Sequence, residues 1–68
     1  MDKDKMIKIL QDFINKNTLP FSKYTVKDYW TENTVFDVIY HIIMIDFSGK
    51  EIIGRVYESQ LRKSGYKF

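Results

Sequence analysis

The sequence predicts an α+β fold: an N-terminal helix packed on a three-stranded antiparallel meander, followed by a short C-terminal helical turn. Apolar residues recur at helical spacing near the N-terminus and then alternate with period two, and turn signals separate the later apolar runs. The chain has 68 residues, the size of one small domain. We therefore expect residues 1–68 to form a single small α+β domain.

The N-terminal segment has the pattern of an amphipathic helix. The apolar positions on its one face are Met6, Ile9, Leu10, Phe13 and Ile14. Asp2 and Asp4 lie where the positive end of a helix dipole favours carboxylates. Asn17, which tolerates a left-handed conformation, and Pro20 would end the segment. A helix is predicted over about residues 3–16.

The next segment predicts a first strand. After a turn at residues 19–22, Tyr24 and Val26 alternate with polar residues, and the extended pattern continues to Thr31. Residues 31–34, Thr-Glu-Asn-Thr, have the composition of a turn.

The middle of the chain, residues 35–47, predicts a strongly apolar strand. One face would carry Val35, Ile39, Ile43, Ile45 and Phe47, and the other Phe36, Val38, Tyr40, Ile42 and Met44. A strand that faces water on one side shows polar residues at alternate positions, and this segment does not. We therefore expect a central strand that is covered on both faces.

The last third of the chain predicts a hairpin and a short helix. Residues 46–50 form a turn in which Gly49 can take a positive φ, and the return strand runs over residues 51–57. Gly54 inside this strand suggests a bulge or a close backbone approach. Ser59 can cap a helical turn over residues 60–64.

The end of that helical turn also carries a stop signal. Gly65 suits the position just past the helix, where a left-handed conformation is common. Residues 66–68 would then form a tail or a short last strand.

The composition excludes several kinds of chemistry. Without cysteine the chain has no disulfide and no thiolate metal site, and His41 is its single histidine. His41 and Asp37 lie four positions apart on one strand face, ~13 Å, which is too far for a direct pair. A dyad would need a carboxylate from a neighbouring strand. We therefore expect no catalytic residues, no metal, no cofactor and no enzymatic activity.

The chain also lacks the features of a membrane or secreted protein. It has no apolar run of the ~20 residues that cross a bilayer, and its N-terminus has no signal-peptide layout. We expect a cytoplasmic protein with no membrane partner and no small-molecule cofactor.

The surplus of aromatic residues suggests a protein-binding surface. Five Tyr, five Phe and one Trp are more than so small a core can enclose, and protein interfaces are rich in such side chains. The candidate interface residues are Tyr29, Trp30, Tyr57, Tyr66 and Phe68. The partner would be another protein, either from a host or a second copy of this chain.

Basic and aromatic residues also occur together, which suggests a nucleic-acid-binding protein as the alternative. The candidate phosphate contacts are Lys23, Lys27, Arg62, Lys63 and Lys67. The net charge is only +2, less than the excess that small DNA-binding proteins usually carry.

The overall composition suggests a source. The chain contains no Ala and is rich in Ile, Lys, Asn, Tyr and Phe, a bias expected of an AT-rich gene. With its small size, this indicates an accessory protein of a phage or mobile element that inhibits or regulates a larger bacterial protein.

Overall fold

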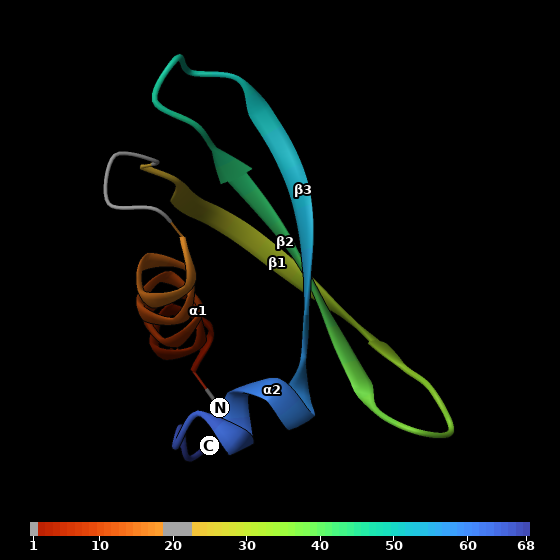
Figure 1. Cartoon of the computed structure of the whole chain (residues 1–68). Coiled ribbons are helices and arrows are strands. Elements are labelled where there is room, and N and C mark those ends of the chain that lie inside the picture. The colour runs from red at the N-terminus through yellow and green to blue at the C-terminus, as the bar shows by residue number, and fades with distance from the viewer. Residues whose placement is uncertain (1, 19–22) are drawn as a thin grey trace.

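The structure is a computed structural model that describes residues 2–18 and 23–68. Its elements are α1 (Lys3–Asn17), β1 (Thr25–Asn33), β2 (Val38–Ile45), β3 (Glu51–Tyr57) and α2 (Glu58–Lys63). The strands form one antiparallel sheet in the order β1-β2-β3, with α1 and α2 on the same side of it (Figure 1). The predicted fold class is confirmed, and β2 is the central strand.

Helix α1 begins as predicted and ends differently. Its N-cap is Asp2, whose side chain accepts a hydrogen bond from the Asp4 N–H (3.1 Å). At the other end the Asn17 amide donates to the Phe13 carbonyl, and the Thr18 hydroxyl donates to the Ile14 carbonyl. These side chains satisfy the last carbonyls, so Asn17 needs no left-handed conformation and does not adopt one.

The turn predicted at residues 19–22, with its proline, lies outside the described residues. Neither described helix is long and apolar enough to cross a membrane.

The first hairpin turn lies further along the chain than predicted. β1 continues to Asn33 and the turn occupies residues 34–37, not 31–34. Val35 and Phe36 were predicted in the central strand, but they form the tip of this turn and are 94% and 97% exposed. β2 is therefore shorter than expected.

The side chain of Thr34 closes this turn. Its hydroxyl donates to the Asp37 carbonyl (2.7 Å) and accepts from the Asp37 N–H (3.0 Å). Tight two-residue hairpin turns usually need positive φ at their central residues, which β-branched and aromatic residues resist. The hydroxyl takes the place of a backbone acceptor, so a Val-Phe tip is tolerated.

The second hairpin turn, at residues 46–50, is confirmed. Gly49 has φ of 85°, as predicted. The Asp46 carboxylate accepts hydrogen bonds from the Ser48 hydroxyl, the Ser48 N–H and the Lys50 N–H. These bonds, above all the one from the Ser48 hydroxyl, hold the pKa of Asp46 below its ordinary value.

β3 has the predicted bounds, but the bulge is elsewhere. The pairing register shifts between Val26 and Asp28 in β1, whereas Gly54 pairs regularly with Ile42. The close approach at Gly54 is confirmed, because a Cβ there would lie 2.7 Å from the Met44 Cε.

Helix α2 begins two residues earlier than predicted, and Ser59 is not its cap. The Gln60 side chain accepts a hydrogen bond from the Tyr57 N–H (2.9 Å) and satisfies that donor. Ser59 lies inside the helix, and its hydroxyl donates to the Asp37 carboxylate (2.6 Å). This bond ties the first hairpin turn to α2.

The end of α2 matches the prediction. Gly65 has φ of 95°, its N–H donates to the Arg62 carbonyl, and the Tyr66 N–H donates to the Leu61 carbonyl. This pair of bonds is a Schellman motif, and it turns the C-terminal tail back toward the helical side of the sheet.

The core lies on one face of the sheet only. Its buried members are Met6, Leu10, Val26, Tyr40, Ile42, Met44, Val56 and Leu61. The tail packs on this same face, with the Phe13 and Tyr66 rings 6.4 Å apart and the Tyr40 and Phe68 rings 6.2 Å apart. The prediction that β2 is covered on both faces is therefore wrong within the described residues, because both termini cover the same face.

Candidate binding surface

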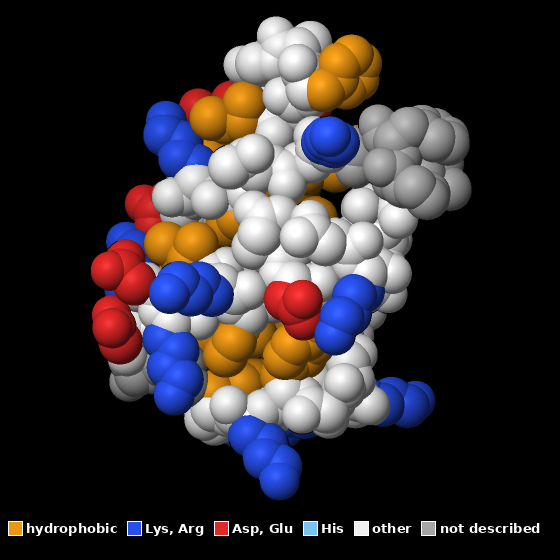
Figure 2. All heavy atoms as spheres, turned by 90° about the vertical axis from the view of Figure 1, so that its left-hand side faces the viewer, with side chains coloured by type: hydrophobic (Ala, Val, Ile, Leu, Met, Phe, Trp, Pro, Cys, Tyr) orange, Lys and Arg blue, Asp and Glu red, His pale blue; other side chains and the backbone are white. Residues whose placement is uncertain are grey.

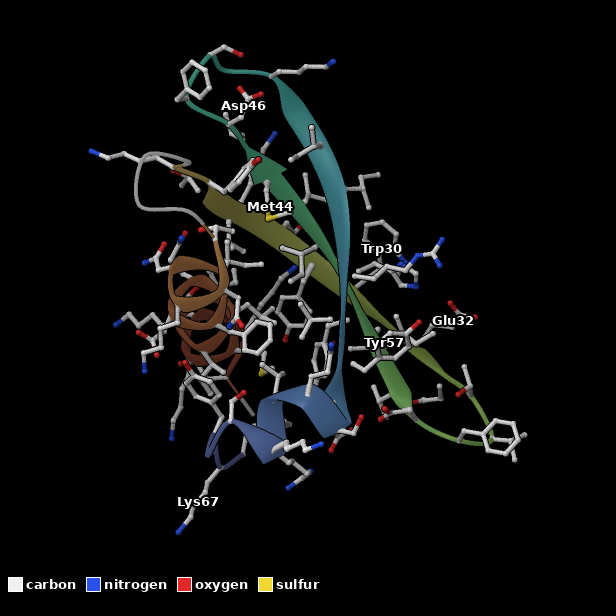
Figure 3. The ribbon with its side chains drawn as sticks, viewed as in Figure 1. Trp30, Glu32, Met44, Asp46, Tyr57 and Lys67 are labelled. Carbon is white, nitrogen blue, oxygen red and sulfur yellow. The ribbon has the colours of Figure 1, made fainter. Side chains whose placement is uncertain are left out.

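The face of the sheet that points away from α1 and α2 is the candidate functional surface, and we call it the open sheet face. Beyond the irregularity in β1, the register of the strands assigns to it Trp30, Glu32, Ile39, His41, Ile43, Ile45, Glu51, Ile53, Arg55 and Tyr57. Figure 3 shows Trp30, Glu32 and Tyr57 on the side of the ribbon opposite α1. No helix or strand of the described residues lies over this face.

Large apolar side chains are exposed on the open sheet face. Ile53 is 64% exposed, Trp30 45% and Tyr57 39%. Ile53 pairs with Ile43, and Tyr57 pairs with Ile39, so each outer apolar residue stands beside an isoleucine of the central strand. Each pair forms an apolar patch, and the two patches lie on either side of the pair formed by His41 and Arg55.

The centre of the open sheet face combines aromatic and polar side chains. The Trp30 and His41 rings are stacked, with centroids 4.9 Å apart and planes at 11°. The Glu32 carboxylate lies 2.9 Å from the His41 Nε2. Arg55 pairs with His41 from the other neighbouring strand. Four side chains from three strands therefore form an aromatic and charged centre.

The Glu32–His41 pair supplies the carboxylate that a histidine dyad would require. A carboxylate can orient an imidazole, but nucleophilic catalysis also needs a hydroxyl or thiol hydrogen-bonded to the ring. Among the described residues, Glu32 is the side chain that hydrogen-bonds to His41, and no group of three or more His, Cys, Asp or Glu could hold a metal ion. The pair therefore holds the ring in place within the surface.

The structure separates the five predicted interface residues. Trp30 and Tyr57 lie on the open sheet face. Tyr29 and Phe68 both contact the ring of Tyr40, a core residue on the helical side of the sheet. Tyr66 packs against α1. Two of the five therefore come together on one surface, and three help to close the core.

Tyr66 has a specific partner on α1. Its hydroxyl donates a hydrogen bond to the Asp12 carboxylate, which also forms an ion pair with Lys16 (3.1 Å). The bond from Tyr66, followed by the bond from Lys16, holds the pKa of Asp12 below its ordinary value, and the carboxylate raises the pKa of the Tyr66 hydroxyl. This contact fastens the tail to the helix.

The five candidate nucleic-acid contacts are also divided. Lys27 pairs with Glu51 (3.5 Å), and Arg62 pairs with Glu58 (2.6 Å). Lys67 lies at the α2 end of the molecule, whereas β1 begins at the opposite end (Figure 3). Figure 2 shows the helical side, where Lys and Arg side chains are scattered among acidic ones. No shared basic surface collects these five residues.

Sequence reasoning did not identify several members of the open sheet face. The sequence predicts Glu32 in a turn, and Ile53 and Arg55 fall within the predicted return strand over residues 51–57 without a signal that marks them as surface residues. The alternation of Glu51, Ile53, Arg55 and Tyr57 marks one face of β3 in the sequence. Placing Glu32 beside His41 requires the register of β1, which depends on the position of the first turn.

A scan against protein-family models and searches of curated proteins and of solved structures gave no match to this chain.

Proposed function

We propose that the protein is a non-enzymatic protein-binding module that uses the open sheet face. The observation that carries the proposal is the exposure of Trp30, Ile53 and Tyr57 on one sheet face. Tryptophan and tyrosine are the side chains that most often dominate the energy of protein interfaces.

The surface also indicates what kind of partner it would bind. Its apolar positions surround a centre formed by Glu32, His41 and Arg55. A partner would contact the apolar positions with aromatic or aliphatic side chains and supply hydrogen-bonding groups to the centre. Trp, Tyr and Arg side chains are enriched in protein interfaces, and this surface carries all three.

The test removes the two exposed rings and asks whether a captured partner is lost. Trp30→Ala and Tyr57→Ala, alone and together, should each weaken capture from a lysate of the native host by about tenfold or more. The matched control is Phe47→Ala, which removes an exposed ring (85%) in the second hairpin turn, outside the open sheet face. Circular dichroism should show each variant folded. A double variant that is folded and still retains every partner would contradict the proposal.

Nucleic-acid binding is the alternative proposal, and the exposed Lys63 and Lys67 at the α2 end support it. Salt separates the two functions. Phosphate contacts would lose affinity steeply between ~50 and 200 mM salt, whereas an apolar protein interface would respond little. A gel-shift assay at low salt without any complex would exclude the alternative.

The finer proposal concerns the biological setting. We propose a cytoplasmic accessory protein of a phage or mobile element that inhibits or regulates a larger bacterial protein. Support comes from the AT-rich coding bias and the small size of the chain. A map of neighbouring genes that shows no phage or mobile-element genes would argue against this setting.

A further inference from the structure

The two edges of the sheet differ in how they are protected. An exposed strand edge carries unpaired N–H and C=O groups that can pair with another chain, and proteins usually block it with bulges, charges or a covering element. The β1 edge is blocked in this way. Its register is irregular between Val26 and Asp28, and the Gln11 side chain of α1 bonds to the Val26 N–H (2.7 Å) and the Tyr24 carbonyl (2.8 Å).

In the described part of the chain, the β3 edge has no bulge and no covering element, and its charged residues are one acid, Glu51, and one base, Arg55. Its pairing with β2 is regular over its whole length, and no proline occurs in it. No described side chain hydrogen-bonds to its backbone between Glu51 and Val56. This edge is therefore a regular template for a further strand.

The register shows which backbone groups of β3 face outward. Hydrogen-bonded and unbonded pairs alternate along an antiparallel ladder. The Asp46 N–H bonds to the Lys50 carbonyl, so Ile52, Gly54 and Val56 bond to β2 in turn. The residues whose N–H and C=O groups point to the free edge are then Glu51, Ile53, Arg55 and Tyr57. Their side chains lie on the same side of the sheet as the open sheet face.

The charges along this edge are self-complementary. In an antiparallel pair of two β3 strands related by a two-fold axis at Ile53, Ile53 faces its own copy. Glu51 then faces Arg55 of the second copy, and Arg55 faces Glu51. Opposite charges that face each other across two strands are stabilising. A shift that centres the axis on Gly54 would instead place Arg55 opposite Ile53 and Glu51 opposite Tyr57.

We infer that β3 pairs antiparallel with β3 of a second copy of this chain, with the two-fold axis at Ile53, to form a six-stranded sheet. The inference uses the edge of the sheet and does not depend on what the open sheet face binds. It adds to the proposed function because the open sheet faces of both copies would adjoin on one side of the dimer. A symmetric dimer of this kind needs no residue outside the described strands.

Charge reversal tests the register. Sedimentation equilibrium should give the wild-type chain twice its monomer mass of 8.2 kDa. Arg55→Glu places like charges opposite each other twice per dimer and should weaken association by about tenfold or more. The double variant Glu51→Arg with Arg55→Glu has the same composition and restores both pairs, so it should recover the wild-type association. Trp30→Ala is the control. Trp30 does not lie on the β3 edge, so its replacement should leave the association into dimers unchanged.

Hydrogen exchange tests the backbone pairing. The Ile53 and Arg55 amides should exchange slowly in the dimer and rapidly after dilution, because their protection depends on the second strand. A chain that stays at 8.2 kDa at about 1 mM would overturn the inference. So would a dimer whose association is unchanged by Arg55→Glu, one that the double variant fails to restore, or one in which the Ile53 amide exchanges freely. If Trp30→Ala is the only variant that disrupts the dimer, the contact lies on the open sheet face. That result would overturn the edge pairing but would leave the proposed function unchanged.

Discussion

The contact between Gln11 and the β1 edge predicts a large effect of Gln11→Leu. The Gln11 amide donates to the Tyr24 carbonyl (2.8 Å) and accepts from the Val26 N–H (2.7 Å), and both bonds are partly buried. Leucine keeps most of the side-chain volume and can make neither bond. Two backbone groups at the junction of α1 and β1 would then lose their partner.

The expected loss follows from the number of bonds. A protein hydrogen bond contributes about 0.5–1.5 kcal/mol net, so two bonds contribute about 1–3 kcal/mol. At about 0.05–0.15 kcal/mol per residue, a domain of this length has a free energy of unfolding of about 3–10 kcal/mol. Gln11→Leu should therefore remove about a third of the stability and lower the Tm by at least about 4 °C.

Urea denaturation followed by circular dichroism measures this loss. Asn15→Ala is the matched control, because Asn15 accepts a bond from the same Gln11 amide but is exposed. It should change the free energy of unfolding by less than about 0.5 kcal/mol. The Val26 amide should exchange faster in Gln11→Leu than in the wild type. A Gln11→Leu chain as stable as the control, with a Val26 amide that still exchanges slowly, would refute the reasoning.

Four further substitutions test other parts of the fold. Ile42 lies in the fully buried centre of β2, and Ile42→Ala should lower the free energy of unfolding by about 2–5 kcal/mol in urea denaturation. Ile53→Ala, studied in dilute solution, should lower it by less than about 1 kcal/mol. Equal losses would mean that the open sheet face is buried. Folding lowers the pKa of Asp46, so its stabilising contribution is present above the unfolded pKa of about 4 and is lost as the pH falls toward the folded value. Asp46→Asn should therefore flatten the acid side of the curve of Tm against pH, and an unchanged curve would contradict this. Gly65→Ala should lower the free energy of unfolding by about 1–2 kcal/mol in thermal unfolding, because φ is 95° at this position. A neutral effect would mean that the tail can reach the helical side of the sheet without a positive φ at residue 65.

The elements that could be predicted are those set by local chemistry. The spacing of Met6 and Leu10 predicted α1, and Gly49 and Gly65 predicted the two positions of positive φ. The first turn could not be placed, because Thr34 closes it with a side-chain hydroxyl and its Val-Phe tip has the composition of a strand. A period-two pattern cannot distinguish such a tip from the strand that follows it.

The candidate site depended on long-range packing. The apolar content of both faces of β2 was evident, but nothing local determines which face the termini cover. Tyr66 and Phe68 reach the helical side because of the turn at Gly65 and the contact of Tyr66 with Asp12. The pairing of Glu32 with His41 likewise needed the strand register. Sequence reasoning therefore identified Trp30 and Tyr57 as surface residues without the neighbours that surround them.

The bond between Tyr66 and Asp12 joins residues 54 positions apart, whereas each strand of the meander pairs with the strand that follows it. Closing a longer loop costs more chain entropy, so the two hairpins can assemble before the tail docks on α1. During unfolding we expect the opposite order of events. The tail should detach before the sheet unfolds, and a protease that cuts near Gly65 would then expose the Phe13 and Tyr40 rings that the tail contacts.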